Sequence, residues 1–180
     1  ITFYCCPNGF KFWTSRARSN LISLQTIVID IDAHKSDLTT DQLQAHIKEF
    51  VPKLLDKLFF TPNFISFTGR GVHFWYCIEP CHASFLDTYN RCAKGLVSCF
   101  KEAVSSIGES ILEVDERASG NATRLYRIPY SYNLKSGTWS DGEMLHTERL
   151  PIETLHGALQ ALKYVSCFPE REKEKEKSVN

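Results

Sequence analysis

The spacing of apolar residues along this chain predicts a mixed α/β protein. Residues 21–32 form a largely apolar run rich in β-branched residues, which predicts a buried strand. Residues 64–68 and 72–79 predict two further strands, connected by a short turn that contains glycine. Because successive side chains of a strand point to opposite faces, one face of the last strand can pack in a core through Val72, Phe74, Tyr76 and Ile78.

Three other segments carry apolar residues at helical spacing, and they cover residues 39–58, 83–107 and 151–164. Thr39 can cap the first of these helices, and we expect Pro52 to kink or split it. Gly108 is a suitable stop for the second helix. The aromatic-rich first twenty residues, with a turn at Pro7-Asn8-Gly9, predict a short hairpin.

The chain of 180 residues has the length of one domain. We assign residues 1–168 to this domain. Residues 169–180 are rich in Lys and Glu, which predicts a charged linker or tail that leads to a further domain. The first residue is Ile rather than Met, so we expect the chain to be part of a longer protein.

Composition excludes several classes of protein. The 21 basic and 21 acidic residues give a net charge of zero, so any binding of nucleic acid must use a local patch. No apolar run has the length of a membrane span, and no signal peptide opens the chain. Seven cysteines without a regular framework fit the reduced thiols of a cytoplasmic protein. Cys77, Cys81 and His82 could alternatively belong to a zinc cluster, whereas Cys92 and Cys99 have the spacing of core residues.

Two carboxylates end the first strand. Asp30 and Asp32 share one face of it, roughly 6–7 Å apart. Like charges in an apolar setting raise each other's pKa or require a cation, and oxygen ligands favour Mg²⁺ or Mn²⁺. The alternative is that both aspartates only end the strand and cap the next turn.

The turn between the second and third strands carries a second candidate site. Glycines on both sides of Arg70, in Thr68-Gly69-Arg70-Gly71, allow positive φ and close approach of a ligand to backbone N–H groups. His73 follows and can donate a hydrogen bond to a phosphate. The alternative is a glycine hairpin with an incidental arginine and a half-buried histidine.

A third set of residues begins at Asp115, which follows a short strand predicted at residues 111–114. Asp115 could complete a three-carboxylate site for two metal ions. Arg124, Arg127, Asn133 and Lys135 follow in a basic stretch that could bind phosphate groups. Surface ion pairs with nearby acidic residues are the alternative for the arginines. Together the three sets point to nucleoside triphosphate chemistry.

These stretches resemble the three motifs of the archaeo-eukaryotic primase superfamily. Asp-Ile-Asp ends an apolar strand, Thr-Gly-Arg-Gly-Val-His lies on a hairpin, and Asp115 precedes Arg-Ile-Pro-Tyr-Ser-Tyr-Asn-Leu-Lys. The resemblance runs from about Asn20 to Lys135 and is greatest to the primase-polymerase domains of plasmid, phage and mobile-element replication proteins. The chain departs from the family at Pro129-Tyr130, where Pro-Gly is frequent, and it has no convincing zinc stem.

The resemblance implies an RRM-like antiparallel catalytic sheet flanked by helices, beside a smaller N-terminal α/β unit. It implies that Asp30, Asp32 and Asp115 are the metal ligands of a two-metal Mg²⁺ or Mn²⁺ site. His73 matches the histidine that binds the phosphates of the incoming nucleotide, and the stretch from Arg127 to Lys135 resembles a segment beside that nucleotide.

The function implied is that of a DNA-dependent primase or polymerase, a nucleotidyltransferase that makes or extends primers during replication of a mobile element. Its expected partners are a single-stranded DNA template, NTP or dNTP, and a helicase or helical accessory domain in the same chain. One alternative is a non-catalytic module that binds single-stranded nucleic acid through Phe74, Trp75 and Tyr76. Another is a two-metal nuclease.

Overall fold

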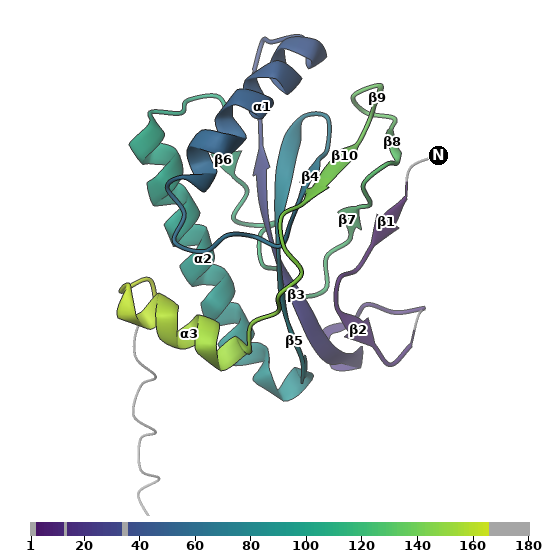
Figure 1. Ribbon diagram of the computed structural model, residues 1–180. Helices are drawn as coiled ribbons and strands as arrows, with labels where there is room; N and C mark the ends of the chain where they lie inside the picture. The colour runs from purple at the N-terminus through teal and green to yellow at the C-terminus, as the bar shows by residue number, and fades with distance from the viewer. Residues whose placement is uncertain (1–2, 13, 34–35, 166–180) are drawn as a thin grey trace, which may run out of the picture.

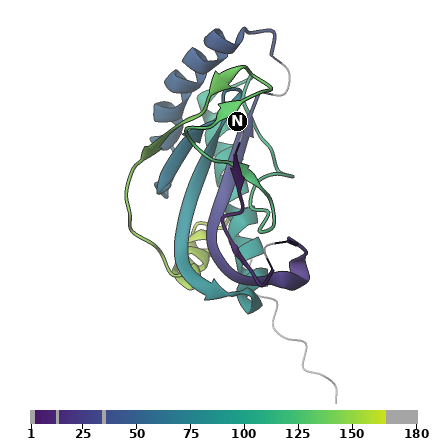
Figure 2. The same ribbon diagram turned by 90° about the vertical axis from the view of Figure 1, so that its right-hand side faces the viewer.

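The computed structural model describes residues 3–12, 14–33 and 36–165. It has the predicted mixed α/β architecture, in which a curled antiparallel sheet is covered by helices (Figures 1 and 2). The strands of the main sheet follow in the order β10 (Asp141–Met144), β4 (Phe64–Phe67), β5 (Gly71–His82), β3 (Leu21–Asp32) and β2 (Gly9–Phe10). The short strand β6 (Glu113–Val114) pairs with the end of β3.

Three α-helices lie on one face of this sheet (Figure 2). They are α1 (Thr40–Leu55), α2 (Leu86–Ile107) and α3 (Ile152–Ala161), and single 3₁₀ turns precede β3 (Arg18–Asn20) and α2 (Ala83–Phe85). Every second residue of β3 and β5 packs against the helices, as the alternation predicts: Ile27, Ile29, Ile31, Val72, Phe74, Tyr76 and Ile78 are all buried in the main core. The other face of the sheet is therefore available for polar side chains.

The helix ends agree with the signals in the sequence. Thr39 caps α1 in a capping box with Gln42, and Gly108 ends α2 in the left-handed conformation with φ 75°. The predicted split at Pro52 is wrong, because α1 continues through Pro52 to Leu55. Proline removes one backbone hydrogen bond of the helix. Pro52 lies in the last turn of α1, so only a few helical hydrogen bonds follow it. None of the described helices is long and apolar enough to cross a membrane.

The predicted N-terminal hairpin is also wrong. β1 (Tyr4–Cys5) pairs with β7 (Tyr126–Arg127), and β2 pairs with β3. The two short strands thus join distant parts of the chain instead of each other. The side chain of Asn8, in the expected turn, instead accepts bonds from the β3 backbone at Gln25 and Thr26, and β1 and β2 each find a partner elsewhere in the chain. Trp13, the charged tail and the predicted domain boundary at residue 168 lie outside the described residues.

Two small elements complete the face opposite the helices. β7 lies over this face, where Tyr126 forms a second apolar cluster with Val28 and Trp75. Next in the chain is a small hairpin of β8 (Tyr132–Asn133) and β9 (Thr138–Trp139), which projects near the β4–β5 turn at the upper right of Figure 1. These segments build the walls around the predicted site.

Candidate active site

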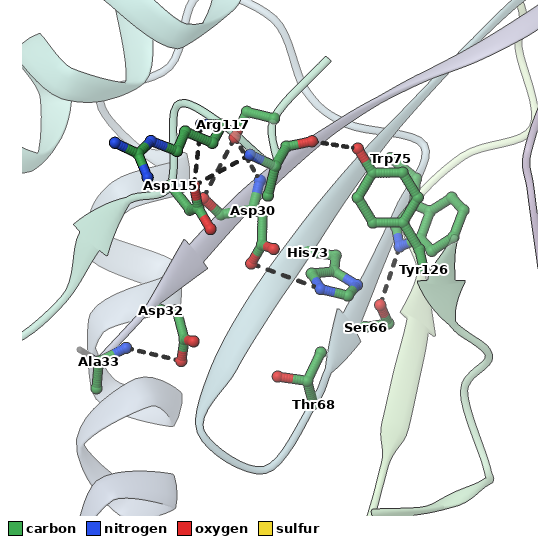
Figure 3. A network of polar contacts seen from close by, with 12 residues as sticks. Asp30, Asp32, Ala33, Ser66, Thr68, His73, Trp75, Asp115, Arg117 and Tyr126 are labelled. Atoms are coloured by element: carbon green, nitrogen blue, oxygen red, sulfur yellow. Dashed lines mark hydrogen bonds and ion pairs between the residues drawn. The ribbon is translucent and has the colours of Figure 1, made fainter. Parts of the chain in front are cut away.

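Asp30 and Asp32 lie on the face of the sheet that the helices leave uncovered. Their neighbours Ile29 and Ile31 point into the main core, so the period of the strand directs both carboxylates to the opposite side. Figure 3 shows the Asp30 carboxylate directed at His73 and the Asp32 carboxylate at the end of the strand. There one Asp32 oxygen accepts a bond from the backbone N–H of Ala33 at 2.9 Å.

His73 lies directly across the sheet from Asp30. The two residues are register partners of β5 and β3, and Nε2 of His73 is 3.5 Å from a carboxylate oxygen of Asp30. The imidazole ring contacts Tyr126, with 5.4 Å between ring centroids, and Trp75, with 6.2 Å. These aromatic rings bury His73 to 7% exposure, so its orientation is fixed by packing.

The electrostatics of this pair reflect its buried and crowded setting. Burial raises the pKa of Asp30 to about 7, with further contributions from the charges of Asp32 and Asp115, and Arg124 opposes this rise. Burial also lowers the pKa of His73 to about 3, assisted by the positive charges of Arg124 and Arg127. His73 is therefore a neutral imidazole at neutral pH and adds no positive charge beside Asp30.

A polar hollow joins most of the predicted residues, and we call it the acidic-basic cleft. Its lining combines two acidic residues with basic residues and aromatic rings. Its lining consists of Tyr4, Asp30, Asp32, Thr68, Arg70, His73, Arg124, Leu125, Tyr126, Arg127, Asn133 and Lys135. Residues predicted from three separate stretches of sequence thus share one cavity.

Two buried nitrogen atoms of cleft residues have no hydrogen-bond partner within the described part of the chain. They are Nδ1 of His73 and Nη1 of Arg127. The other terminal nitrogen of Arg127 donates to the hydroxyl of Tyr4 at 3.2 Å, and the guanidinium lies 5.1 Å from the centre of that tyrosine ring. Buried polar groups without partners are unfavourable, and a ligand with oxygen acceptors would satisfy the guanidinium.

Asp115 lies beside the cleft and does not line it. Its backbone N–H donates to the Asp30 carbonyl at 2.8 Å, which places the two residues next to each other. One Asp115 carboxylate oxygen accepts bonds from the backbone N–H groups of Arg117 and Ala118, at 2.9 and 3.0 Å (Figure 3). Asp115 therefore caps a turn in this structure, and its predicted role as a metal ligand remains a prediction.

The structure gives Asn133 a positioning contact. Its side-chain nitrogen donates to the carbonyl of Thr68, and its oxygen accepts from the backbone N–H of Lys135 at 3.0 Å. Asn133 is almost completely buried. It thereby fixes the β8 segment against the β4–β5 turn and holds Lys135 at the edge of the cleft.

Gly69 and Gly71 face a different hollow, on the other side of the β4–β5 turn. Gly69 has φ +98°, as the glycine pattern predicts. Gly71 is a glycine for a packing reason, because a Cβ atom there would collide with the carbonyl oxygen of Ile31. Thr68 and Arg70, which alternate with these glycines, point to the acidic-basic cleft.

Sequence reasoning missed Tyr4, Leu125 and Tyr126 as lining residues. Tyr126 holds the His73 ring in place and donates a hydrogen bond to the carbonyl of Ala118 at 2.6 Å. The pattern Arg-Leu-Tyr-Arg gave a signal for it, since an aromatic residue lies between two predicted phosphate ligands. Tyr4 gave no such signal, because its place in the cleft depends on the pairing of β1 with β7.

The aromatic stacking platform proposed for a binding module is wrong. Phe74 and Tyr76 face the main core with 0% and 5% exposure, and the indole of Trp75 donates to Ser66 at 2.9 Å in a site with 9% exposure. None of these rings is available to a base. Cys92 and Cys99 are buried core residues, as predicted.

Comparison with known proteins gives a likeness of fold. No protein-family model matches the chain, and no curated protein matches it. Among solved structures, the AEP domain of the primase-polymerase (PrimPol) of cyanophage S-2L is similar, with a TM-score of 0.57. The sequences are 13% identical, and the alignment covers 87% of this chain and 69% of that one. The primase-polymerase fold that the three motifs predicted is therefore confirmed.

Proposed function

We propose that this chain is a nucleotidyltransferase of the primase-polymerase type, which makes or extends a primer on a DNA template. The observation that carries the proposal is the acidic-basic cleft. It combines two carboxylates with arginine, lysine and histidine groups in one cavity, on a fold similar to that of a primase-polymerase domain. A nucleoside triphosphate with a divalent cation has the complementary charges.

Asp30, Asp32 and Asp115 would hold Mg²⁺ or Mn²⁺. Hard carboxylate oxygens suit these ions. Burial, together with the charges of Asp32 and Asp115, raises the pKa of Asp30, and a bound cation would favour its ionised form. Within the described ranges no three His, Cys, Asp or Glu side chains are gathered closely enough to coordinate an ion, so binding requires these side chains to move closer together. The chemistry that such cations supply is activation of a 3′-hydroxyl and stabilisation of the leaving pyrophosphate.

The basic residues of the cleft would hold the triphosphate. Arg127 has a buried nitrogen without a partner among the described residues, and Arg70, Arg124 and Lys135 line the same cavity. Guanidinium groups bind phosphate oxygens with two parallel hydrogen bonds. The imidazole of His73 would contribute one further hydrogen bond to the phosphates. Thr68 and Asn133 line this cavity and would shape it, and Gly69 and Gly71 would set the path of the turn that carries Thr68 and Arg70.

The partners we propose are a single-stranded DNA template, ribo- or deoxynucleoside triphosphates, and a helicase or helical accessory domain further along the same chain. We propose that the protein acts in replication of a plasmid, phage or other mobile element and works in the cytoplasm. A two-metal nuclease is the rival reading, but it gives no reason for a cluster of triphosphate-binding groups beside the acidic pair.

The test is synthesis on unprimed and on primed single-stranded DNA with Mn²⁺ or Mg²⁺ and each set of nucleotides. The double substitution Asp30→Asn with Asp32→Asn keeps the shape of both side chains and removes their charge. Since metal stabilisation of phosphoryl transfer contributes several kcal/mol, we expect product formation to fall about a hundredfold or more. Asp41→Asn, in the first turn of α1, is the matched control and should leave synthesis unchanged.

Two results would contradict the proposal. Synthesis by the double variant at the rate of the unmodified protein would remove the metal assignment. Degradation of labelled DNA with metal and without nucleotide, in place of synthesis, would show the nuclease instead.

A further inference from the structure

A second hollow lies behind the β4–β5 turn, and we call it the lateral pocket. Its volume is about 530 Å³, within the range of sites for small organic groups. Helix α1 forms one wall through Gln44 and Lys48, and the strands after the cleft form the other through Tyr130, Trp139 and Asp141. The floor includes Phe67. The pocket thus combines aromatic rings with one basic and one acidic group.

The lateral pocket is separated from the acidic-basic cleft by a single turn. Thr68 and Arg70 line the cleft, whereas Gly69 and Gly71 line the lateral pocket. A chain that leaves the cleft across this turn would therefore reach the lateral pocket directly. The side chains of Ser136 and Thr138 fill the space beside Gly69, since a Cβ atom there would lie 2.5 Å from their hydroxyl groups.

Tyr130 is held in an unusual way at the mouth of this pocket. Its φ is +61°, a left-handed conformation that favours glycine. Its N–H donates to the carbonyl of Ser140 at 3.0 Å and its hydroxyl to the carbonyl of Gly142 at 2.9 Å. The side chain is nevertheless 68% exposed. A strained, fixed and exposed aromatic residue adds little to a core, and such positions cluster at binding sites.

Trp139 supplies a second exposed ring to the same pocket. It is 67% exposed, and its orientation is supported by an edge contact with Tyr132, at 5.6 Å between ring centroids. Proteins that hold single-stranded nucleic acid use such fixed aromatic faces for stacking, together with nearby basic groups for the backbone. Lys48 lies in this pocket, and Arg70 and Lys135 lie just across the turn.

We propose that the lateral pocket binds an unpaired base of single-stranded DNA, stacked on Tyr130 and Trp139. The choice of DNA rests on the proposed function, in which a template strand passes the cleft. The stacking itself requires only an unpaired base, which a strand or a free nucleotide could supply.

The experiment measures binding of fluorescein-labelled oligo(dT) by anisotropy, with the full chain and with EDTA present so that the metal-dependent cleft does not contribute. Tyr130→Gly suits the local backbone and removes the ring, and Trp139→Ala removes the other ring. Each should weaken binding about fivefold or more, the effect of losing one stacking contact. Trp139→Phe should retain most of the affinity. Phe59→Ala, an exposed aromatic residue away from the pocket, is the matched control and should bind normally.

Each outcome decides the matter. Competition by thymidine monophosphate at similar concentration would assign the pocket to free nucleotides, and weak competition would assign it to a strand; both support base stacking. Failure of the unmodified protein to bind, or unchanged binding by Tyr130→Gly and Trp139→Ala, would overturn the inference. Preference for oligo(U) over oligo(dT) would overturn the choice of DNA.

The Asp30→Asn, Asp32→Asn variant should bind oligo(dT) as the unmodified protein does. Loss of synthesis with intact Tyr130-dependent binding would overturn only the proposed function.

Discussion

At the scale of single residues, chemistry that is unusual for its surroundings was visible in the sequence. Two aspartates at the end of an apolar strand and a histidine after a Gly-Arg-Gly turn are difficult to explain by packing, and the structure brings Asp30, Asp32 and His73 into one cleft. Residues whose role depends on a distant contact were not visible. Tyr4 is an ordinary aromatic residue until β1 pairs with β7 and brings it beneath Arg127.

Tyr4 provides a prediction at this scale. Its hydroxyl and ring both contact the Arg127 guanidinium, so it positions that group for phosphate. Tyr4→Ala removes both contacts, together about 1–2 kcal/mol, and should raise the apparent KM for nucleotide about fivefold or more with little change in kcat. Tyr4→Phe keeps the ring and should show a smaller rise. Steady-state kinetics would check this, with Phe3→Ala as control; an unchanged KM in Tyr4→Ala would exclude the positioning role.

At the scale of elements, segments with their own periodicity were predicted well. The alternation of β5 placed Val72, Phe74 and Tyr76 in the core, and the caps at Thr39 and Gly108 set the helix ends. The two-residue strands β1 and β2 carry too little periodicity to indicate a partner, and their pairing is decided by tertiary contacts. The predicted hairpin failed for this reason.

The contact between α1 and the end of α2 gives a prediction about pH. The Glu109 carboxylate accepts bonds from the backbone N–H groups of Ile111 and Leu112 and lies 2.9 Å from Nε2 of His46. Burial raises the pKa of Glu109, but these hydrogen bonds and the His46 charge outweigh it, so the pKa is lowered overall. The folded state therefore gains stability from ionised Glu109 above the unfolded pKa of about 4.5. This gain is lost as the pH falls through the lower folded pKa.

Glu109→Gln should reduce the free energy of unfolding at pH 7 by about 1–2 kcal/mol. The difference from the unmodified protein should shrink as the pH falls below about 4.5, because protonation then removes the same charge. Denaturant unfolding at several pH values would measure it. Glu49→Gln, at an exposed position of α1, is the control. A constant difference across the whole pH range would show that the charge of Glu109 is not the cause.

At the scale of the whole molecule, the order of motifs along the chain indicated the fold, and the similar primase-polymerase domain confirms it. What the sequence could not indicate is how the far ends of the chain close over the sheet. Asn8 illustrates this closure. β3 has an irregularity between Leu24 and Thr26, where the backbone N–H groups lose their regular partners, and the Asn8 oxygen accepts from Gln25 at 2.7 Å and from Thr26 at 3.3 Å.

The Asn8 nitrogen donates to the carbonyl of Ala122 at 3.0 Å, two residues before Arg124 of the cleft. One buried amide thus joins the N-terminal segment, the central strand and the loop that carries a predicted phosphate ligand.

Asn8→Ala would leave buried donors and an acceptor without partners. We expect a loss of about 3 kcal/mol in the free energy of unfolding, or roughly 6–12 °C in melting temperature. Affinity for nucleotide should fall as well, since the loop before Arg124 loses its anchor. Asn90→Ala, at a half-buried position of α2, should change stability by less than about 0.5 kcal/mol. If Asn8→Ala melted like the control, the closure would depend on the strand pairs β1–β7 and β2–β3 alone.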